Sequence, residues 1–501
     1  MRQRIAIFLV LIHCANAAAQ IPTPPDFNLP DFGSPADTVM NKAQEAQIGR
    51  RVVAQLRNAG AIMEDPQVTE YIQTLGAQLA GHANDGTQSF EFFMVDDDAI
   101  NAFALPGGFI GVNAGLILAS ETESEVAGVL AHEVAHVTQR HIARSLYDRQ
   151  RSSILSIATM MAAVLFSMAS DSRSNDAMSG ILAAGQAATM QRQINFTRSN
   201  ELEADRIGIG TLSSAGFDPS SMATFFEKLS RRFGSRSAPA FLLTHPTSPE
   251  RIADARIRIR QLPPAVNIEN SVSYEAVRAR LEVLRAPRDD VALNIFQTRV
   301  EAGSDNVGDL YGLALSLSKT GLDDDAQRHY SDLIDAYPGI VAFRIGEAES
   351  LLQNRQITDA LQRYADAMEI SPRNVPLTTS YAEALILTGR PEIAHEFLLD
   401  LLHNTSSPTV GLFRLIARAA NAEGDVGNSH HYMSHYYASI GSFSDALNQI
   451  RMALESPGVD AVDLARFQSE FADLNVNMSS ERRNRRSESM PREEPPRFSY
   501  P

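Results

Sequence analysis

The sequence has a single cysteine, Cys14, which lies close to the N-terminus. Arg2 and Arg4 precede an apolar run, and small residues follow it, as is typical of a secretory signal peptide that is cleaved off. We therefore expect the chain to be exported and residues 1–19 to be removed. A lipid-anchored Cys14 is a weaker alternative, because the three residues before it are not small. The mature chain would lack cysteine, which excludes disulfides, a cysteine nucleophile and cysteine metal ligands.

Positive charge is also scarce. Lys and Arg number 44 against 60 Asp and Glu, which gives a formal charge of -16. This balance argues against nucleic acid as a partner and against a general affinity for anionic lipid.

No internal apolar run reaches the roughly 20 residues that a membrane-spanning helix needs. In the segment 154–190, two apolar stretches flank a short polar one. We expect a helical hairpin that packs over the functional site. The alternative is a hairpin that dips into a membrane and makes a peripheral contact with it.

A helical pattern without proline extends from Glu121 to about Leu146, and Ser120 with Glu123 is typical of a capping box at its start. Within this helix, His132 and His136 are one turn apart on the same face. That spacing suits two ligands of a tetrahedral Zn²⁺ ion. Glu133 is placed to accept a proton from water at the metal's open position. Two ordinary surface histidines are the alternative.

A second motif, Glu201-Leu202-Glu203-Ala204-Asp205, supplies the carboxylates that a zinc site needs. Glu201 and Asp205 are one helical turn apart, so one can bind the metal while the other orients a histidine ring. The spacing does not decide which of them does which, and Glu203 points elsewhere.

Residues 101–112 are typical of two strands joined by a Pro-Gly-Gly turn. Proline and glycine favour a position at the edge of a sheet. We expect the first strand, Asn101, Ala102, Phe103 and Ala104, to pair with an extended substrate backbone. The alternative is a hairpin that only packs against the zinc helix.

An internal repeat occupies the C-terminal part. Ala326, Ala360 and Ala394 are each 34 residues apart, which is the tetratricopeptide period. The chain therefore divides into a signal peptide (1–19), a proline-rich leader (20–40), a metal-binding domain (41–262), a helical connector (263–304), a repeat domain (305–475) and a disordered tail (476–501).

Three blocks, beginning at His132, Glu201 and Thr244, together resemble the motifs of the HtpX and CAAX-prenyl-protease metallopeptidases. The third block reads Thr-His-Pro-Thr-Ser-Pro-Glu-Arg-Ile. The exported branch with a tetratricopeptide tail is the most similar. The resemblance covers about residues 41–260 by motif and the rest by architecture.

The resemblance implies that His132, His136 and Glu201 bind one Zn²⁺ per chain and that Glu133 is the general base. It implies that Asp205 belongs to the catalytic group by orienting a ligand, and we assign Arg251 the same supporting position. His245 precedes Pro246 and should lie in a loop. It is either a fourth zinc ligand at rest or a contact for the substrate or its oxyanion. His141, five residues beyond His136, should not be a ligand.

The fold class expected is a mainly helical α+β, zincin-like protease domain followed by an all-α solenoid. The resemblance implies a zinc endopeptidase that is free in the periplasm or peripheral to the outer membrane, and whose substrates are misassembled outer-membrane β-barrel proteins. Its partner would be the β-barrel assembly machinery, contacted through the repeats. The alternatives are a non-proteolytic assembly chaperone with a structural or latent zinc site, and a housekeeping protease whose repeats shield the site.

Overall fold

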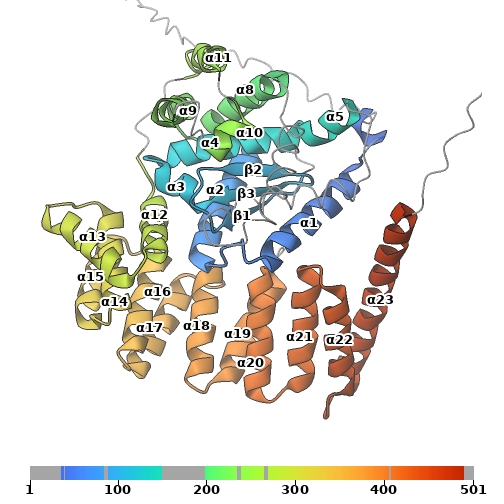
Figure 1. The fold of residues 1–501 in the computed structure, drawn as a ribbon. Helices are drawn as coiled ribbons and strands as arrows, with labels where there is room; N and C mark the ends of the chain where they lie inside the picture. The colour runs from blue at the N-terminus through green and yellow to red at the C-terminus, as the bar shows by residue number, and fades with distance from the viewer. Residues whose placement is uncertain are drawn as a thin grey trace, which may run out of the picture.

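The computed structural model describes residues 35–38, 40–83, 88–148, 198–233, 239–246, 248–263, 269–405 and 408–489. The expected signal peptide, nearly all of the leader and the expected hairpin at 154–190 lie outside these residues. No helix in the described ranges combines the length and the apolar character needed to cross a membrane. An α+β part lies above a row of antiparallel helices (Figure 1), which confirms the fold class expected from the sequence.

A small mixed sheet lies inside the α+β part. Its strands are β1 (Glu91–Val95), β2 (Ala102–Leu105) and β3 (Phe109–Asn113), in the order β1-β3-β2. Strand β3 pairs in parallel with β1 and antiparallel with β2. Gly107 and Gly108 have φ angles of 84° and 92° in the turn between β2 and β3, where a side chain would be strained. The predicted hairpin is confirmed, and β2 lies at the edge of the sheet.

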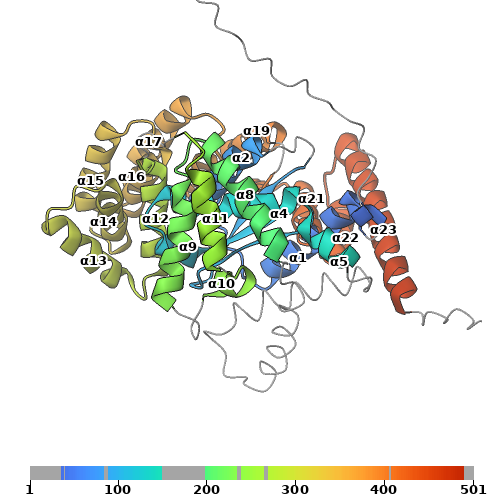
Figure 2. The same cartoon turned by 90° about the horizontal axis from the view of Figure 1, so that it is seen from above.

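Helices surround this sheet, and Figure 2 shows α4, α8 and α11 lying over it. The helices of this part are α1 (Lys42–Asn58), α2 (Pro66–His82), α3 (Ala114–Ala119), α4 (Glu123–Thr138), α5 (His141–Asp148), α8 (Arg198–Ser214), α9 (Ser220–Phe233), α10 (Ala240–Thr244) and α11 (Pro249–Ile259), preceded by a 3-10 turn (Pro35–Thr38). Helix α4 is buried from Glu123 to His136, so it is the central helix of the core.

The bounds of α4 correct the sequence interpretation. Its N-cap is Thr122, whose hydroxyl accepts a hydrogen bond from the Glu125 N–H, whereas Ser120 lies at the C-cap of α3. The predicted capping box is therefore wrong. The helix also does not continue to Leu146, because Arg140 adopts a φ of 50° and a new helix, α5, begins after it. Asp37, Glu45 and the Met40 carbonyl hold the Arg140 guanidinium in this conformation.

The remaining helices form the row of the repeat domain. They are α12 (Val272–Arg285), α13 (Asp289–Glu301), α14 (Val307–Lys319), α15 (Asp323–Ala336), α16 (Val341–Gln353), α17 (Ile357–Ile370), α18 (Val375–Leu387), α19 (Pro391–Asn404), α20 (Val410–Glu423), α21 (Val426–Ser439), α22 (Phe443–Glu455) and α23 (Ala461–Ser489). Ala326, Ala360 and Ala394 are fully buried at equivalent positions of α15, α17 and α19. The period seen in the sequence is therefore a packing period, with a small residue where two helices touch.

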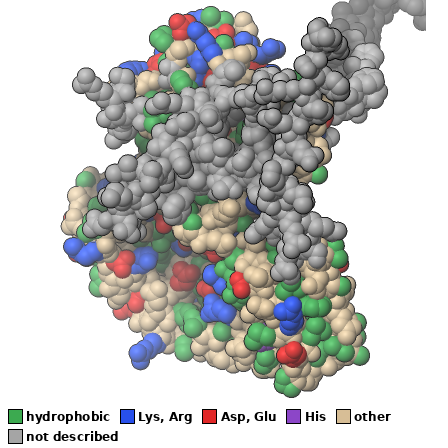
Figure 3. All heavy atoms as spheres, turned by 45° about the vertical axis from the view of Figure 1, so that its right-hand side comes forward, with side chains coloured by type: hydrophobic (Ala, Val, Ile, Leu, Met, Phe, Trp, Pro, Cys, Tyr) green, Lys and Arg blue, Asp and Glu red, His purple; other side chains and the backbone are tan. Residues whose placement is uncertain are grey.

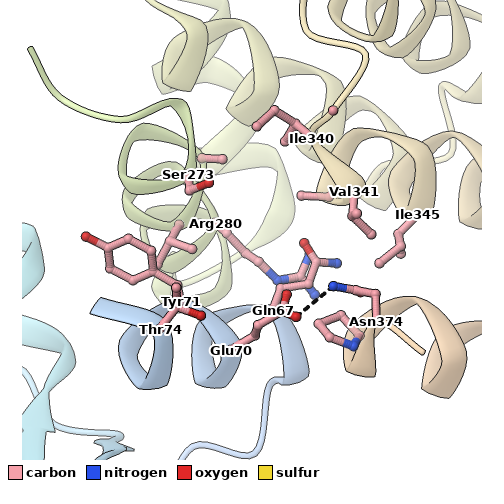
Figure 4. A pocket seen from close by; sticks show the side chains of 15 residues that line it. Gln67, Glu70, Tyr71, Thr74, Ser273, Arg280, Ile340, Val341, Ile345 and Asn374 are labelled. Carbon is pink, nitrogen blue, oxygen red and sulfur yellow. Dashed lines mark hydrogen bonds between the residues drawn. The ribbon is translucent and has the colours of Figure 1, made fainter. Parts of the chain in front are cut away.

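The connector helix α12 belongs to both parts of the molecule. Tyr274 and Leu281 join the core around α4, whereas Ala276 and Ala279 join the core of the first repeat helices. Alongside α12, Asn374, the N-cap of α18, donates a hydrogen bond of 2.6 Å to Glu70 of α2 across the pocket in Figure 4. The two parts therefore pack directly on each other.

The last helix, α23, continues to Ser489, into the segment expected to be disordered. It contains neither glycine nor proline, and Pro491 follows shortly after its end. On the face shown in Figure 3, acidic, basic and hydrophobic side chains are interspersed over the repeat helices.

Candidate metal centre

Helix α4 brings two imidazoles together inside the core. His132 and His136 are fully buried, and their Nε2 atoms are 3.0 Å apart. Glu201, on α8, faces the same point, with its carboxylate oxygens 3.5 Å from the Nε2 atom of each histidine. Helix α8 approaches this closely because Gly208 carries no side chain: a Cβ there would lie 3.1 Å from the His132 backbone nitrogen.

His245 completes the group from the loop after α10. Its Nδ1 atom is 3.2 Å from His132 Nε2 and 3.1 Å from Glu201 Oε1. The ring stacks on Phe241 of α10, with centroids 4.9 Å apart, which fixes its orientation. The sequence prediction that His245 lies outside a helix and close to the other three residues is therefore matched by the geometry.

The four side chains fit a tetrahedral metal ion. One ligand atom from each of His132, His136, Glu201 and His245 lies within 4.8 Å of the others. Ligands at about 2.0–2.1 Å from a tetrahedral zinc ion are separated from one another by about 3.4 Å. The contacts of 3.0 to 3.5 Å described above are close to this value. Three imidazole nitrogens and a carboxylate oxygen are also a donor set that zinc accepts.

Asp205 and Arg251 lie behind these ligands. Asp205 Oδ1 is 3.0 Å from His132 Nδ1, the ring nitrogen that faces away from the cluster. Arg251, from α11, donates two hydrogen bonds to Asp205, of 2.7 and 2.8 Å, and its Nη1 is 2.8 Å from Glu201. Of the two carboxylates whose roles the spacing left open, Glu201 faces the histidines and Asp205 orients one of them.

The charged groups of the cluster favour a cation at its centre. Burial lowers the pKa of His132, but Asp205 and Glu201 outweigh this effect and raise it to about 9. Burial raises the pKa of Asp205, but His132 and Arg251 outweigh it and bring that pKa below its usual value. A positive charge is thus favoured between the carboxylates, and a divalent ion can supply it.

Glu133 lies beside the four-residue cluster without joining it. It is fully buried, and Oε1 is 3.4 Å from His245 Nε2. Burial raises the pKa of Glu133, while the imidazoles of His245 and His132 and, after them, the Ala104 backbone of the edge strand β2 act in the opposite direction. The expected base and the expected substrate strand therefore lie close to each other.

One supporting residue, His141, was not predicted from the sequence. His141 Nδ1 lies 2.9 Å from His136 Nδ1, and its Nε2 lies 3.2 Å from Glu203 Oε2. His141 is not a member of the ligand group, as expected, but the argument from a continuous helix was wrong, since the helix breaks at Arg140. Glu203, set aside as pointing elsewhere, steadies this ring. No local pattern announces a break at an arginine, so the contact was not foreseeable.

A buried His-Glu-x-x-His helix with an acidic third ligand on a neighbouring helix is typical of metal-dependent peptidases. The family model described as Peptidase family M48 matches residues 66–259, and a tetratricopeptide-repeat model matches residues 351–408. The chain belongs to peptidase family M48 and is a metalloprotease of the subgroup that carries tetratricopeptide repeats.

Named relatives support this assignment. The chain is 34% identical over 453 residues to the "Beta-barrel assembly-enhancing protease" of Escherichia coli, covering 89% of this chain and 91% of that one. It is 43% identical over 270 residues to the "Putative beta-barrel assembly-enhancing protease" of Vibrio cholerae, covering 54% and 55%. It is 34% identical over 163 residues to the "Mitochondrial metalloendopeptidase OMA1" of Arabidopsis thaliana, covering 32% and 30%.

Proposed function

We propose that this chain is an exported zinc endopeptidase of the periplasm that cleaves misassembled outer-membrane β-barrel proteins and assists their assembly through its repeat domain. The observation that carries the catalytic part is the near-tetrahedral group of His132, His136, Glu201 and His245 with Glu133 beside it. The substrate class is supported by the name of the Escherichia coli relative, whose length the chain covers almost completely. The signal-like N-terminus supports export.

His132, His136 and Glu201 would hold the zinc ion. When bound, the ion would polarise the substrate carbonyl and lower the pKa of water at the site. Glu133 accepts the proton of the attacking water and then delivers it to the leaving amine.

We propose that the substrate backbone aligns along residues Asn101 to Ala104, which comprise the residue before β2 and most of that strand. In the part of the chain that the structure describes, β2 pairs on one side only, with β3. An extended peptide added on the open side would gain main-chain hydrogen bonds and lie next to Glu133. The buried Asn101 Oδ1 has no hydrogen-bond partner among the described residues, so it is available to a peptide N–H.

We propose that His245 is the fourth zinc ligand of the resting enzyme. Its Nδ1 atom is at ligand spacing from His132 and Glu201, and a neutral imidazole competes well with water for zinc. A peptide could then reach the metal only after His245 moves. Asp205 and Arg251 act as positioning residues, since both contact ligands and lie behind them.

The repeat domain is proposed to bind clients and the β-barrel assembly machinery. Tetratricopeptide arrays bind proteins on extended surfaces, and this array is packed against the protease domain through α2, α12 and α18. A non-proteolytic assembly chaperone with a structural zinc is the second candidate, favoured by the words "assembly-enhancing" in the relative's name. The chaperone candidate gives no reason for a buried Glu133 beside the metal cluster.

Glu133→Gln separates the two candidates. The variant should keep its fold and one bound zinc ion at the active site, but lose proteolysis of a misfolded outer-membrane protein by at least about 10²–10⁴-fold, because an amide cannot accept the proton. Zinc content, circular dichroism and cleavage are measured together. Glu121→Gln, an exposed position just before the same helix, is the control and should cleave normally. Full turnover by Glu133→Gln would leave only the chaperone.

A further inference from the structure

A second cluster of metal-binding side chains lies at the C-terminal end of the repeat domain. His431 and His435 are one turn apart on α21, and Glu470 reaches them from α23. One ligand atom from each lies within 4.8 Å of the others. His431 Nδ1 is 2.7 Å and His435 Nε2 is 3.4 Å from the same carboxylate oxygen of Glu470.

His431 and Glu470 make a short, buried contact. Both atoms are buried, and in the described part of the chain neither has a hydrogen bond of normal geometry. At 2.7 Å the two atoms are close enough to bind a common ion together with His435, and the clustering of all three residues is what the geometry offers such an ion.

Neighbouring side chains fix the orientation of His431, His435 and Glu470. Ser434 donates a hydrogen bond of 2.9 Å to the other oxygen of Glu470. The His435 ring stacks on Phe413 and the His431 ring lies against Phe467, with centroids 5.3 and 5.0 Å apart.

We propose that His431, His435 and Glu470 bind one divalent transition-metal ion, with Zn²⁺ the best match to two imidazoles and a carboxylate. The His435 side chain is 40% exposed, so the remaining coordination position opens to solvent. The ion cross-links α21 to α23 and fastens the last helix to the end of the array. Tyr432 follows His431, where the first site has the glutamate Glu133. The second site therefore has no base for hydrolysis, and its role would be structural.

The test measures Zn²⁺ binding to the untagged, chelator-treated full chain by equilibrium dialysis. His435→Ala and Glu470→Gln should each bind one equivalent less than the wild type, with affinity at this site reduced at least about 100-fold. His395→Ala is the matched control. His395 forms a 2.8 Å ion pair with Glu423 in the same domain but belongs to no metal-binding group in the described ranges, so its loss should leave the zinc count unchanged.

Two further measurements keep the result unambiguous. His132→Ala, which removes a ligand of the first site, should still bind zinc at the second, so failure of the proposed catalytic site does not imitate failure here. Zinc should raise the thermal midpoint of the wild type more than that of His435→Ala, and His435→Cys should restore binding. Equal zinc counts in the wild type and a folded His435→Ala, or no zinc in His132→Ala, would overturn the proposal.

Discussion

Two groups in the described part of the chain share a pattern of two histidines and a glutamate. In the α+β part, two histidines one turn apart on α4 face a glutamate from α8; in the repeat domain, two histidines on α21 face a glutamate from α23. The first group is fully enclosed and has Glu133 and His245 beside it. The second is half open to solvent at His435 and has no acidic neighbour in the equivalent position.

The difference between the two clusters teaches what a catalytic metal site requires beyond ligands. Behind the first, Asp205 and Arg251 form a buried network that holds both His132 and Glu201. Behind the second, a single serine hydroxyl holds Glu470. Spacing alone can assemble ligands, whereas the buried base and the charged support decide whether hydrolysis follows.

The largest effect should come from removing the charged support of the first cluster. Arg251→Met leaves the carboxylates of Asp205 and Glu201 buried without their cation, which should cost about 3–5 kcal/mol of unfolding free energy in the zinc-free chain. Urea denaturation measures the loss. Arg418→Met breaks only the exposed contact with Glu383 and should cost less than about 1 kcal/mol. Equal losses in the two variants would mean that the network does not support the site.

An intermediate effect on stability should come from the close packing of helices in the repeat domain. A Cβ on Gly312 of α14 would lie 2.3 Å from the Phe296 ring. Gly312→Ala should therefore lower the unfolding free energy by about 1–3 kcal/mol. Gly210→Ala, on α8, meets no atom within 4 Å and should instead raise it by about 0.5–1 kcal/mol, because alanine favours a helix. The same sign for both variants, measured by thermal denaturation, would contradict the packing argument.

The smallest change in free energy should come from His245, the fourth member of the first cluster, which has no counterpart in the second. His245→Ala should retain zinc and raise proteolysis or self-cleavage, by about tenfold if nine-tenths of the molecules are latched at rest. Initial cleavage rates measure the change, and His403→Ala, at an exposed position, should behave as the wild type. Lower activity with unchanged zinc would assign His245 to the substrate or its oxyanion instead.

Local patterns predicted much of the fold because their causes are local. The 34-residue spacing of Ala326, Ala360 and Ala394 reflects a contact that each repeat makes in the same way, and all three are buried. The hairpin of β2 and β3 was predictable because Pro106, Gly107 and Gly108 favour a turn. The helix boundary near Ser120 was missed, since Thr122 offers an equally good cap two residues later.

The sequence by itself determined the helical face that carries His132 and His136, because one turn of helix brings residues four apart together whatever surrounds them. Only the tertiary structure decided that Glu201 faces the histidines while Asp205 orients one of them, since both lie on the same face of α8. It also decided that His141 supports His136, because a helix break at Arg140 redirects the chain. Positions close in sequence are constrained by backbone geometry, whereas contacts between distant segments depend on how whole helices pack.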